Sequence, residues 1–81
     1  MIQHLLNIEA NDRPVLLERV LRVIRHRGFT ILKVTATQNQ SNKIAKIEII
    51  VESERPISLI TNQVEKLWDI RTVDVTTLES A

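Results

Sequence analysis

The sequence has no cysteine and no tyrosine, and its 81 residues include one glycine, one phenylalanine and one tryptophan. The lack of cysteine excludes disulfide bonds, thiolate nucleophiles and metal sites with sulfur ligands. The single glycine, Gly28, excludes a glycine-rich loop that cradles phosphate groups. The sequence contains 11 Lys and Arg residues and 10 Asp and Glu residues, so its net charge is +1. This charge gives no global field to attract nucleic acid or an anionic membrane. No apolar run is long enough to span a bilayer, so we expect a cytoplasmic protein.

The length of the chain predicts one domain, covering residues 1–81, with a small core. A core of this size contributes about 3–5 kcal/mol of stability by itself. We therefore expect the chain to associate with a second copy or with another protein.

The segment 12–31 contains both a start signal and a stop signal for a helix. Pro14 fits the first turn of a helix, and Asp12 can accept hydrogen bonds from the free amides there. Gly28 can adopt the left-handed conformation that closes a last turn. We predict a helix from Asp12 or Arg13 to Arg27, with one apolar stripe formed by Leu16, Leu17, Val20, Leu21, Val23 and Ile24.

The remaining elements follow from alternating apolar residues, β-branched segments and a second proline. A hairpin turn is expected at residues 38–42, and a second helix is expected from Pro56 to near Trp68. Leu32, Val34 and Ala36 are expected to face the core, opposite Lys33. Four strands are predicted, at Ile2 to Ala10, Phe29 to Thr37, Lys43 to Glu52 and Asp69 to Leu78.

This order, βαββαβ, predicts an α+β protein of the ferredoxin-like fold. Right-handed crossovers then give a four-stranded antiparallel sheet with both helices on one face. The other face is expected to be wet, with Leu5 and Ile50 as its only apolar side chains. The second strand lies at an edge of the sheet, where its free backbone groups can pair with another copy. We predict a dimer through this edge, at Ile31, Lys33, Thr35 and Thr37.

No residue pattern predicts catalysis by this chain alone. His4 and His26 have no carboxylate at the spacing of metal ligands, and no serine has a nucleophile motif. Arg19, Arg22, Arg25 and His26 share one side of the first helix and could contact phosphates, but a solvated face with Glu18 paired to Arg22 is favoured. RNA-binding domains of the same topology stack bases on aromatic residues of the open sheet face, where this sequence has none.

Two apolar residues are candidates for contact with a partner protein. Trp68 lies at the predicted end of the second helix, and large aromatic residues are common at binding hot spots, although burial in the core is the favoured interpretation. Leu59 lies opposite the apolar stripe of the same helix.

The first strand, the segment Asn11-Asp12-Arg13-Pro14, the run LLERVLRVIRHRGF from Leu16 to Phe29, and the ending from Leu67 to Val75 resemble an ACT domain. The run LERVLRVIRHRGF is similar to the short small subunits of acetolactate synthase, of the isozyme II type. The resemblance implies a non-catalytic regulatory subunit in the biosynthesis of valine, leucine and isoleucine. Its implied partner is a large catalytic subunit that uses thiamine diphosphate, Mg²⁺ and FAD.

The resemblance also implies an amino-acid effector site in which several positions are altered. In valine-sensitive relatives the loop after the first strand resembles Asn-x-x-Gly, and an Asn follows the Arg-Gly-aromatic turn. The matching positions here are Asp12, Val15 and Thr30, beside Asn11. A branched side chain and a carboxylate would obstruct the effector, so we expect activation with a poor response to valine. The alternative function is a free-standing amino-acid sensor with no enzyme partner.

Overall fold

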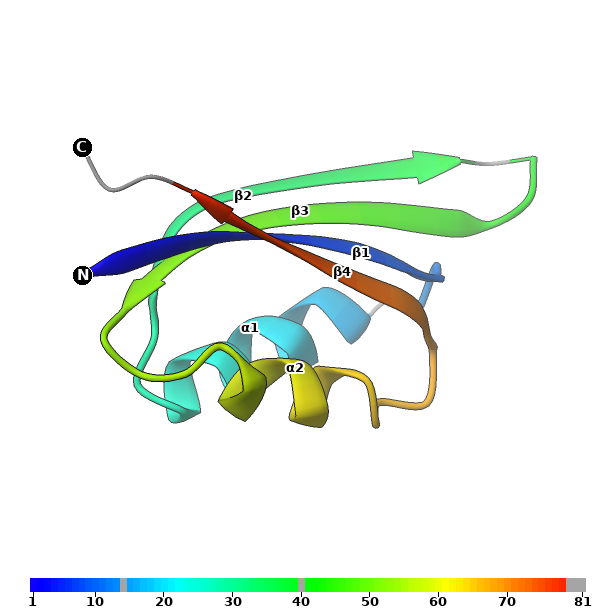
Figure 1. The fold of residues 1–81 in the computed structure, drawn as a ribbon. Coiled ribbons are helices and arrows are strands. Elements are labelled where there is room, and N and C mark those ends of the chain that lie inside the picture. Colours follow the sequence, from blue (N-terminus) through cyan, green and yellow to red (C-terminus); the bar gives the residue numbers. More distant parts are fainter. Residues whose placement is uncertain (14, 40, 79–81) are drawn as a thin grey trace.

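The structure is a computed structural model that describes residues 1–13, 15–39 and 41–78. Its strands follow the order β2-β3-β1-β4, and every neighbouring pair is antiparallel. Both helices cover one face of the sheet, as Figure 1 shows. These observations confirm the ferredoxin-like prediction and place β2 at an edge. The elements are β1 (Ile2–Asn11), α1 (Leu16–His26), β2 (Thr30–Asn39), β3 (Ile44–Ser53), α2 (Ser58–Val64) and β4 (Ile70–Leu78).

The core lies between the two central strands and the two helices. Alternate residues of β1 and β3 point toward the helices, and most are fully buried because the helices exclude water from that face. The stripe of α1 supplies Leu16, Val20 and Ile24, and α2 supplies Ile60 and Val64. The strands contribute Leu6, Ile8, Ala10, Ile47, Ile49 and Val51.

The start of α1 differs from the sequence prediction, because the helix begins at Leu16 and not at Asp12 or Arg13. The strand β1 runs on to Asn11, whose amide donates to the carbonyl of Asp69 at 2.8 Å. The amide of Asp12 donates to the carbonyl of Lys43 at 2.9 Å. These two bonds between distant segments hold residues 11–12 extended, and no side chain caps the helix. Pro14, on which the prediction relied, lies outside the described residues.

The end of α1 agrees with the prediction that Gly28 closes the last turn. Gly28 has a φ of 84°, and its amide donates to the carbonyl of Arg25 at 3.0 Å. The amide of Phe29 donates to the carbonyl of Ile24 at 3.3 Å. This pair of bonds forms a Schellman motif, and the buried side chains of Phe29 and Ile24 supply its apolar contact.

The edge strand β2 is longer than predicted and contains a bulge. It continues to Asn39, so Gln38 belongs to the strand and not to the turn, while Gln40 of the predicted turn lies outside the described residues. The register shifts between Ile31 and Lys33, which leaves Leu32 unpaired and 48% exposed, against the prediction that it faces the core. The bulge turns Ile31 toward the core, where it is partly buried.

The helix α2 is shorter than predicted and ends at Val64. After it, the amide of Leu67 donates to the carbonyl of Val64 at 3.0 Å, which is the tight i to i−3 spacing of a 3₁₀ turn. This turn brings Leu67 against the core and leaves Trp68 outside it. Trp68 is 92% exposed, so the favoured prediction that it is buried was wrong.

Candidate functional site

The connection between β1 and α1 forms a corner with the end of β2. Gln38 donates from Nε2 to Oδ1 of Asp12 at 3.0 Å, and this bond joins two segments 26 residues apart. Arg13 lies on the other side of the connection, with its Nε 3.5 Å from Oδ1 of Asp69. The backbone amides of Asn11 and Asp12 already donate to carbonyls, so neither is free to bind a ligand carboxylate. The corner is therefore tied to three neighbouring segments.

A cavity of about 170 Å³ lies beneath this corner. Its size is below the roughly 300–1,000 Å³ of typical small-molecule pockets. Aliphatic side chains form its floor, and Asp12 places a carboxylate at its rim. The lining residues are Asn11, Asp12, Arg13, Leu16, Leu17, Ala36, Gln38, Ala45 and Ile47. A free amino acid that bonded to the carboxylate oxygen of Asp12 or the amide nitrogen of Gln38 would have to compete with the bond between them.

The predicted effector positions do not all lie together within one copy of the chain. Asn11 and Asp12 line the cavity, while Val15 stands beside it at the start of α1 and is 47% exposed. Thr30 pairs with Glu52 at the opposite end of β2 from Gln38. At the usual rise of about 3.3 Å per residue, the separation of eight positions along the strand spans roughly 25 Å. One copy therefore supplies only part of the predicted set.

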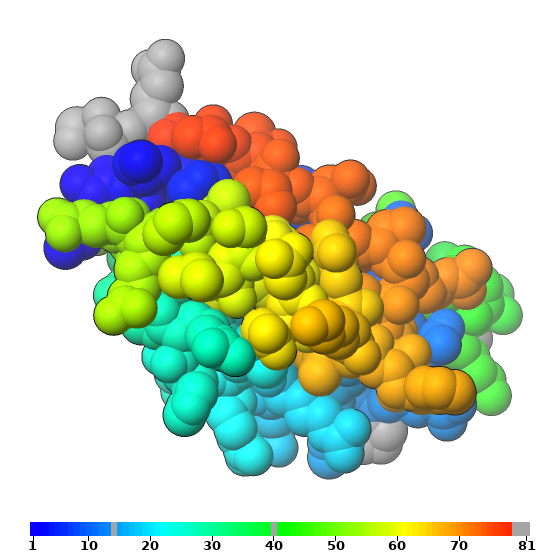
Figure 2. Space-filling view, turned by 60° about the horizontal axis from the view of Figure 1, so that its bottom comes forward, coloured from blue at the N-terminus to red at the C-terminus, as the bar shows by residue number. Residues whose placement is uncertain are grey.

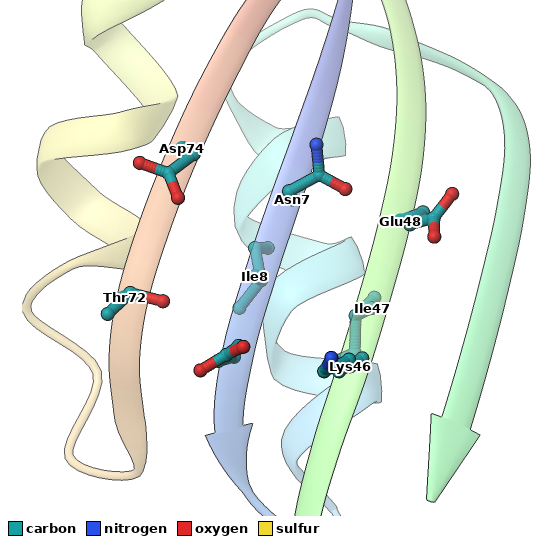
Figure 3. Close-up of a pocket in the computed structure, with 8 residues that line it drawn as sticks. Asn7, Ile8, Lys46, Ile47, Glu48, Thr72 and Asp74 are labelled. Carbon is teal, nitrogen blue, oxygen red and sulfur yellow. The ribbon is translucent and has the colours of Figure 1, made fainter.

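The open face of the sheet is polar, as predicted. It contains a shallow hollow of about 240 Å³ over the three strands β1, β3 and β4. Figure 3 shows Asp74, Asn7 and Glu48 in a row across these strands, while Ile8 and Ile47 point toward the helices behind them. Leu5 and Ile50 are cross-strand partners on the open face and are each half-buried.

The predicted dimer edge is exposed over most of its length. Lys33, Thr35 and Thr37 pair with Ile50, Glu48 and Lys46, on the open side of the sheet. Apart from Ile31, which packs partly against the core, every described residue of β2 is exposed. Lys33 is the one charged residue of the strand. The backbone groups on the outer side of β2 thus face solvent with little charge to protect them.

The two predicted partner contacts are both exposed. Leu59 lies in the first turn of α2 and is 38% exposed. Trp68 follows α2, in the segment that also carries Asp69 of the ion pair with Arg13. Leu59 and Trp68 therefore lie at opposite ends of the short helix.

Sequence reasoning missed two residues that build the corner. Gln38 belongs to the predicted hairpin turn but lies in β2, and the alternation through Ala36 is the signal that could have extended the strand to include it. The sequence predicts Asp69 as the first residue of the fourth strand. Its carbonyl accepts from Asn11 and its carboxylate pairs with Arg13, and no local sequence pattern indicates either contact.

The histidines lie apart from the corner. His4 is buried on the helix-facing side of β1, and His26 is exposed at the end of α1. Within residues 1–13, 15–39 and 41–78, no three His, Asp or Glu side chains are arranged to bind a metal ion. None of the helices in this part of the chain is long and apolar enough to cross a membrane.

Solved structures share this fold at low sequence identity. A homoserine dehydrogenase from Thiobacillus denitrificans matches 96% of this chain and 17% of its own, with a TM-score of 0.80 and 18% identity. The small subunit of acetolactate synthase from Thermotoga maritima matches 98% of this chain and 48% of its own, with a TM-score of 0.75 and 22% identity.

Sequence comparison identifies the family. The model of the ACT domain matches residues 12–73. The small subunit of acetolactate synthase isozyme 2 from Escherichia coli K12 is 39% identical over 75 residues, which cover 93% of this chain and 86% of that protein. A probable acetolactate synthase small subunit from Methanothermobacter thermautotrophicus is 32% identical over 96% of this chain and 46% of its own length. The chain therefore belongs to the ACT domain family and, within it, to the small subunits of acetolactate synthase of the isozyme 2 type.

Proposed function

We propose that this chain is the non-catalytic regulatory subunit of an acetolactate synthase and that it binds and activates a large catalytic subunit. The observation that carries the proposal is the match to the isozyme 2 small subunit over 93% of this chain and 86% of that protein. In this proposal the large subunit holds the thiamine diphosphate, Mg²⁺ and FAD that the family resemblance implies. The small subunit contributes binding surfaces, and the reaction leads toward the branched-chain amino acids.

The proposed subunit is a homodimer joined through β2. An antiparallel pairing of two β2 edges about a two-fold axis places the start of one strand beside the end of the other. Thr30 of the second copy then lies near Gln38 and Asp12 of the first. This arrangement reunites positions that lie roughly 25 Å apart in one copy, and it covers the edge that is otherwise exposed.

The proposed response of the subunit to valine is weak. The carboxylate of Asp12 would repel the carboxylate of a free amino acid, and its bond to Gln38 occupies the rim of the small cavity. Val15 adds a branched side chain where valine-sensitive relatives have glycine. Activation then does not depend on an amino-acid effector.

The regulatory function is tested by co-purification with the large subunit and by an assay of acetolactate formation. We expect a stable complex and a rate higher than that of the large subunit alone. Failure of the chain to co-purify, together with an unchanged rate, would contradict the proposal. The alternative function, a free-standing sensor, instead requires that an amino acid raises the melting temperature of the isolated protein.

The proposed weak response to valine is tested by calorimetry on the wild type and on the variant Asp12→Asn/Val15→Gly. We expect no saturable heat with the wild type, and we expect measurable binding with the variant because the repulsion and the branched side chain are both removed. Saturable binding of valine to the wild type at micromolar concentration would contradict this part of the proposal.

Leu59 and Trp68 are proposed contacts with the large subunit. Exposed tryptophan is often an anchor at protein interfaces because its large surface becomes buried on binding. Substitution of either residue by alanine is expected to weaken the complex. A variant that binds like the wild type would exclude that residue from the interface.

A further inference from the structure

The outer surface of the two helices carries a groove lined by basic residues. Figure 2 shows this face, where α1 and α2 lie side by side. A hollow of about 290 Å³ lies between the helices, with Val23 at its base and Gln63 on the side of α2. Arg22, His26 and Arg27 form its wall on α1. Arg22 and His26 also border a second hollow on the other side of α1, together with Arg25.

Arg55 extends this positive surface beyond the end of α1. Its side chain lies across the turn at Gly28, with its Nε 3.0 Å from the position that a Cβ of residue 28 would occupy. Arg27 directly precedes this turn. We use the name basic groove for the whole surface that joins the two hollows and the turn at Gly28, and we define it by Arg22, Arg25, Arg27 and Arg55.

The guanidinium groups of the basic groove have no acidic partner in the described part of the chain. The ion pair found there joins Arg13 to Asp69 at another place. Glu18 borders the second hollow with Arg22, but the expected pair between these two residues is not formed within 4.0 Å. The side-chain hydrogen bonds of the described residues also involve none of the four groups. Each guanidinium therefore keeps its N–H donors for an external acceptor.

Closing the end of α1 does not require these arginines. The carbonyls of Val23, Ile24 and Arg25 accept from the backbone amides of Arg27, Phe29 and Gly28. Because the backbone satisfies the last turn, the arginine side chains are not needed as caps. The four arginines lie close together, although the whole chain has a net charge of only +1.

We propose that the basic groove binds an acidic surface of the large catalytic subunit, an inference that rests on the proposed regulatory function. Planar guanidinium groups match carboxylates with two parallel hydrogen bonds. Val23 at the base and Leu59, one turn from Gln63 on α2, favour a protein partner, because they can bury apolar side chains among the charged pairs. No Phe, Tyr or Trp side chain lines either hollow as a platform on which nucleic-acid bases could stack.

The test measures the dissociation constant of the complex with the large subunit at low and at physiological ionic strength. The variant Arg22→Glu/Arg27→Glu is expected to bind at least about ten-fold more weakly and to lose most of the salt dependence. The neutral variant Arg22→Gln/Arg27→Gln is expected to show a smaller loss. Both positions are exposed, so we expect the variants to fold. Circular dichroism is used to check that each variant is folded.

The control is Arg71→Glu, which reverses one exposed charge on β4, at a residue that lines neither hollow. It is expected to change the dissociation constant by less than about two-fold. The single variant Arg22→Glu makes the same change of charge as Arg71→Glu. If these two variants weaken binding to the large subunit equally, long-range charge alone explains the effect and the proposal is overturned. The proposal would also be overturned if the variant Arg22→Glu/Arg27→Glu bound the large subunit with the dissociation constant of the wild type. It would be overturned as well if the wild type bound duplex RNA with a dissociation constant as low as that for the large subunit. If the wild type does not bind the large subunit at all, the proposed function fails first.

Discussion

At the residue scale, Gly28 has the conformation that least tolerates a side chain. Its φ of 84° lies in the left-handed region, which costs other residues about 1–2 kcal/mol. We expect Gly28→Ala to lower the free energy of unfolding by about this amount. The added Cβ would touch Nε of Arg55, but that long side chain can move, so the backbone conformation supplies most of the loss.

Urea denaturation of Gly28→Ala, with and without Arg55→Ala, separates these two causes. Removing Arg55 relieves the contact but leaves the backbone conformation unchanged. We expect the loss to persist in the Arg55→Ala background. A loss that disappears there would assign the effect to the contact and contradict the prediction.

Trp68 provides a second test at the residue scale, because it is the only tryptophan and is 92% exposed. We expect the fluorescence of the isolated chain to resemble that of tryptophan in water and to be quenched readily by iodide. Trp68→Ala should change the free energy of unfolding by less than about 0.5 kcal/mol. Leu67→Ala, at the neighbouring half-buried position, should cost about 1 kcal/mol or more. Blue-shifted emission that iodide does not quench would contradict the exposed position.

At the scale of elements, the sequence was sufficient for the order of strands and helices but not for several of their ends. Period-two alternation in β1 and β3 and the stripe of α1 follow directly from burial on one face, so local pattern identifies them. The start of α1 depends on bonds from Asn11 and Asp12 to Asp69 and Lys43, which are distant in sequence. The end of α2 depends on the turn that packs Leu67 and exposes Trp68, although both residues fit the helical spacing.

The candidate site shows the same division. Asp12 was identified from the resemblance and lies at the corner, but no local pattern indicates its bond to Gln38, which is 26 residues away in the sequence. The bulge at Leu32 also changed the side on which Ile31 lies. A bulge shifts every later residue by one position relative to the partner strand, and no local signal in the segment Thr30–Asn39 marks it.

The edge of β2 gives a prediction about the dimer. The midpoint of Thr30–Asn39 lies between Val34 and Thr35, so a symmetric pairing brings the two copies of Thr35 close together. We expect Thr35→Asp to shift the protein toward monomer, because two carboxylates would then meet at the dimer interface. Sedimentation equilibrium measures the change.

The matched control for Thr35→Asp is Thr72→Asp on the other edge strand. Thr35 lies opposite Glu48 and Thr72 lies opposite Glu9, so each variant places a new carboxylate beside an existing one within its own sheet. The loss of stability within a single copy should therefore be similar in the two variants. A dimer that survives Thr35→Asp but not Thr72→Asp would place the interface on β4.

At the scale of the whole molecule, charge separates between the two faces. The helix face carries the basic groove, while the hollow of the open sheet face is lined by three carboxylates, those of Glu9, Glu48 and Asp74, and by one basic residue, Lys46. A net charge of +1 hides this difference between the faces, because composition gives only the total charge and so predicts no global field toward nucleic acid or an anionic membrane. The interactions of such a molecule depend on the charges at each surface. Salt should therefore change the affinity at the basic groove and the affinity at the β2 edge to different extents.

The small core leads to a prediction about stability and concentration. A chain of 81 residues contributes about 3–5 kcal/mol from its own core, so dimer formation should supply a large part of the total. Above the dissociation constant of the dimer, each tenfold rise in concentration adds about 1.4 kcal/mol per dimer. For a dimer of this size that increment raises the melting temperature by about 3–6 °C. Calorimetry at several concentrations should show this rise for the wild type and for Thr72→Asp, whereas Thr35→Asp should melt at one temperature throughout. A wild-type melting temperature that does not change with concentration would mean that the isolated chain folds as a monomer, and the pairing of β2 edges would then require the large subunit.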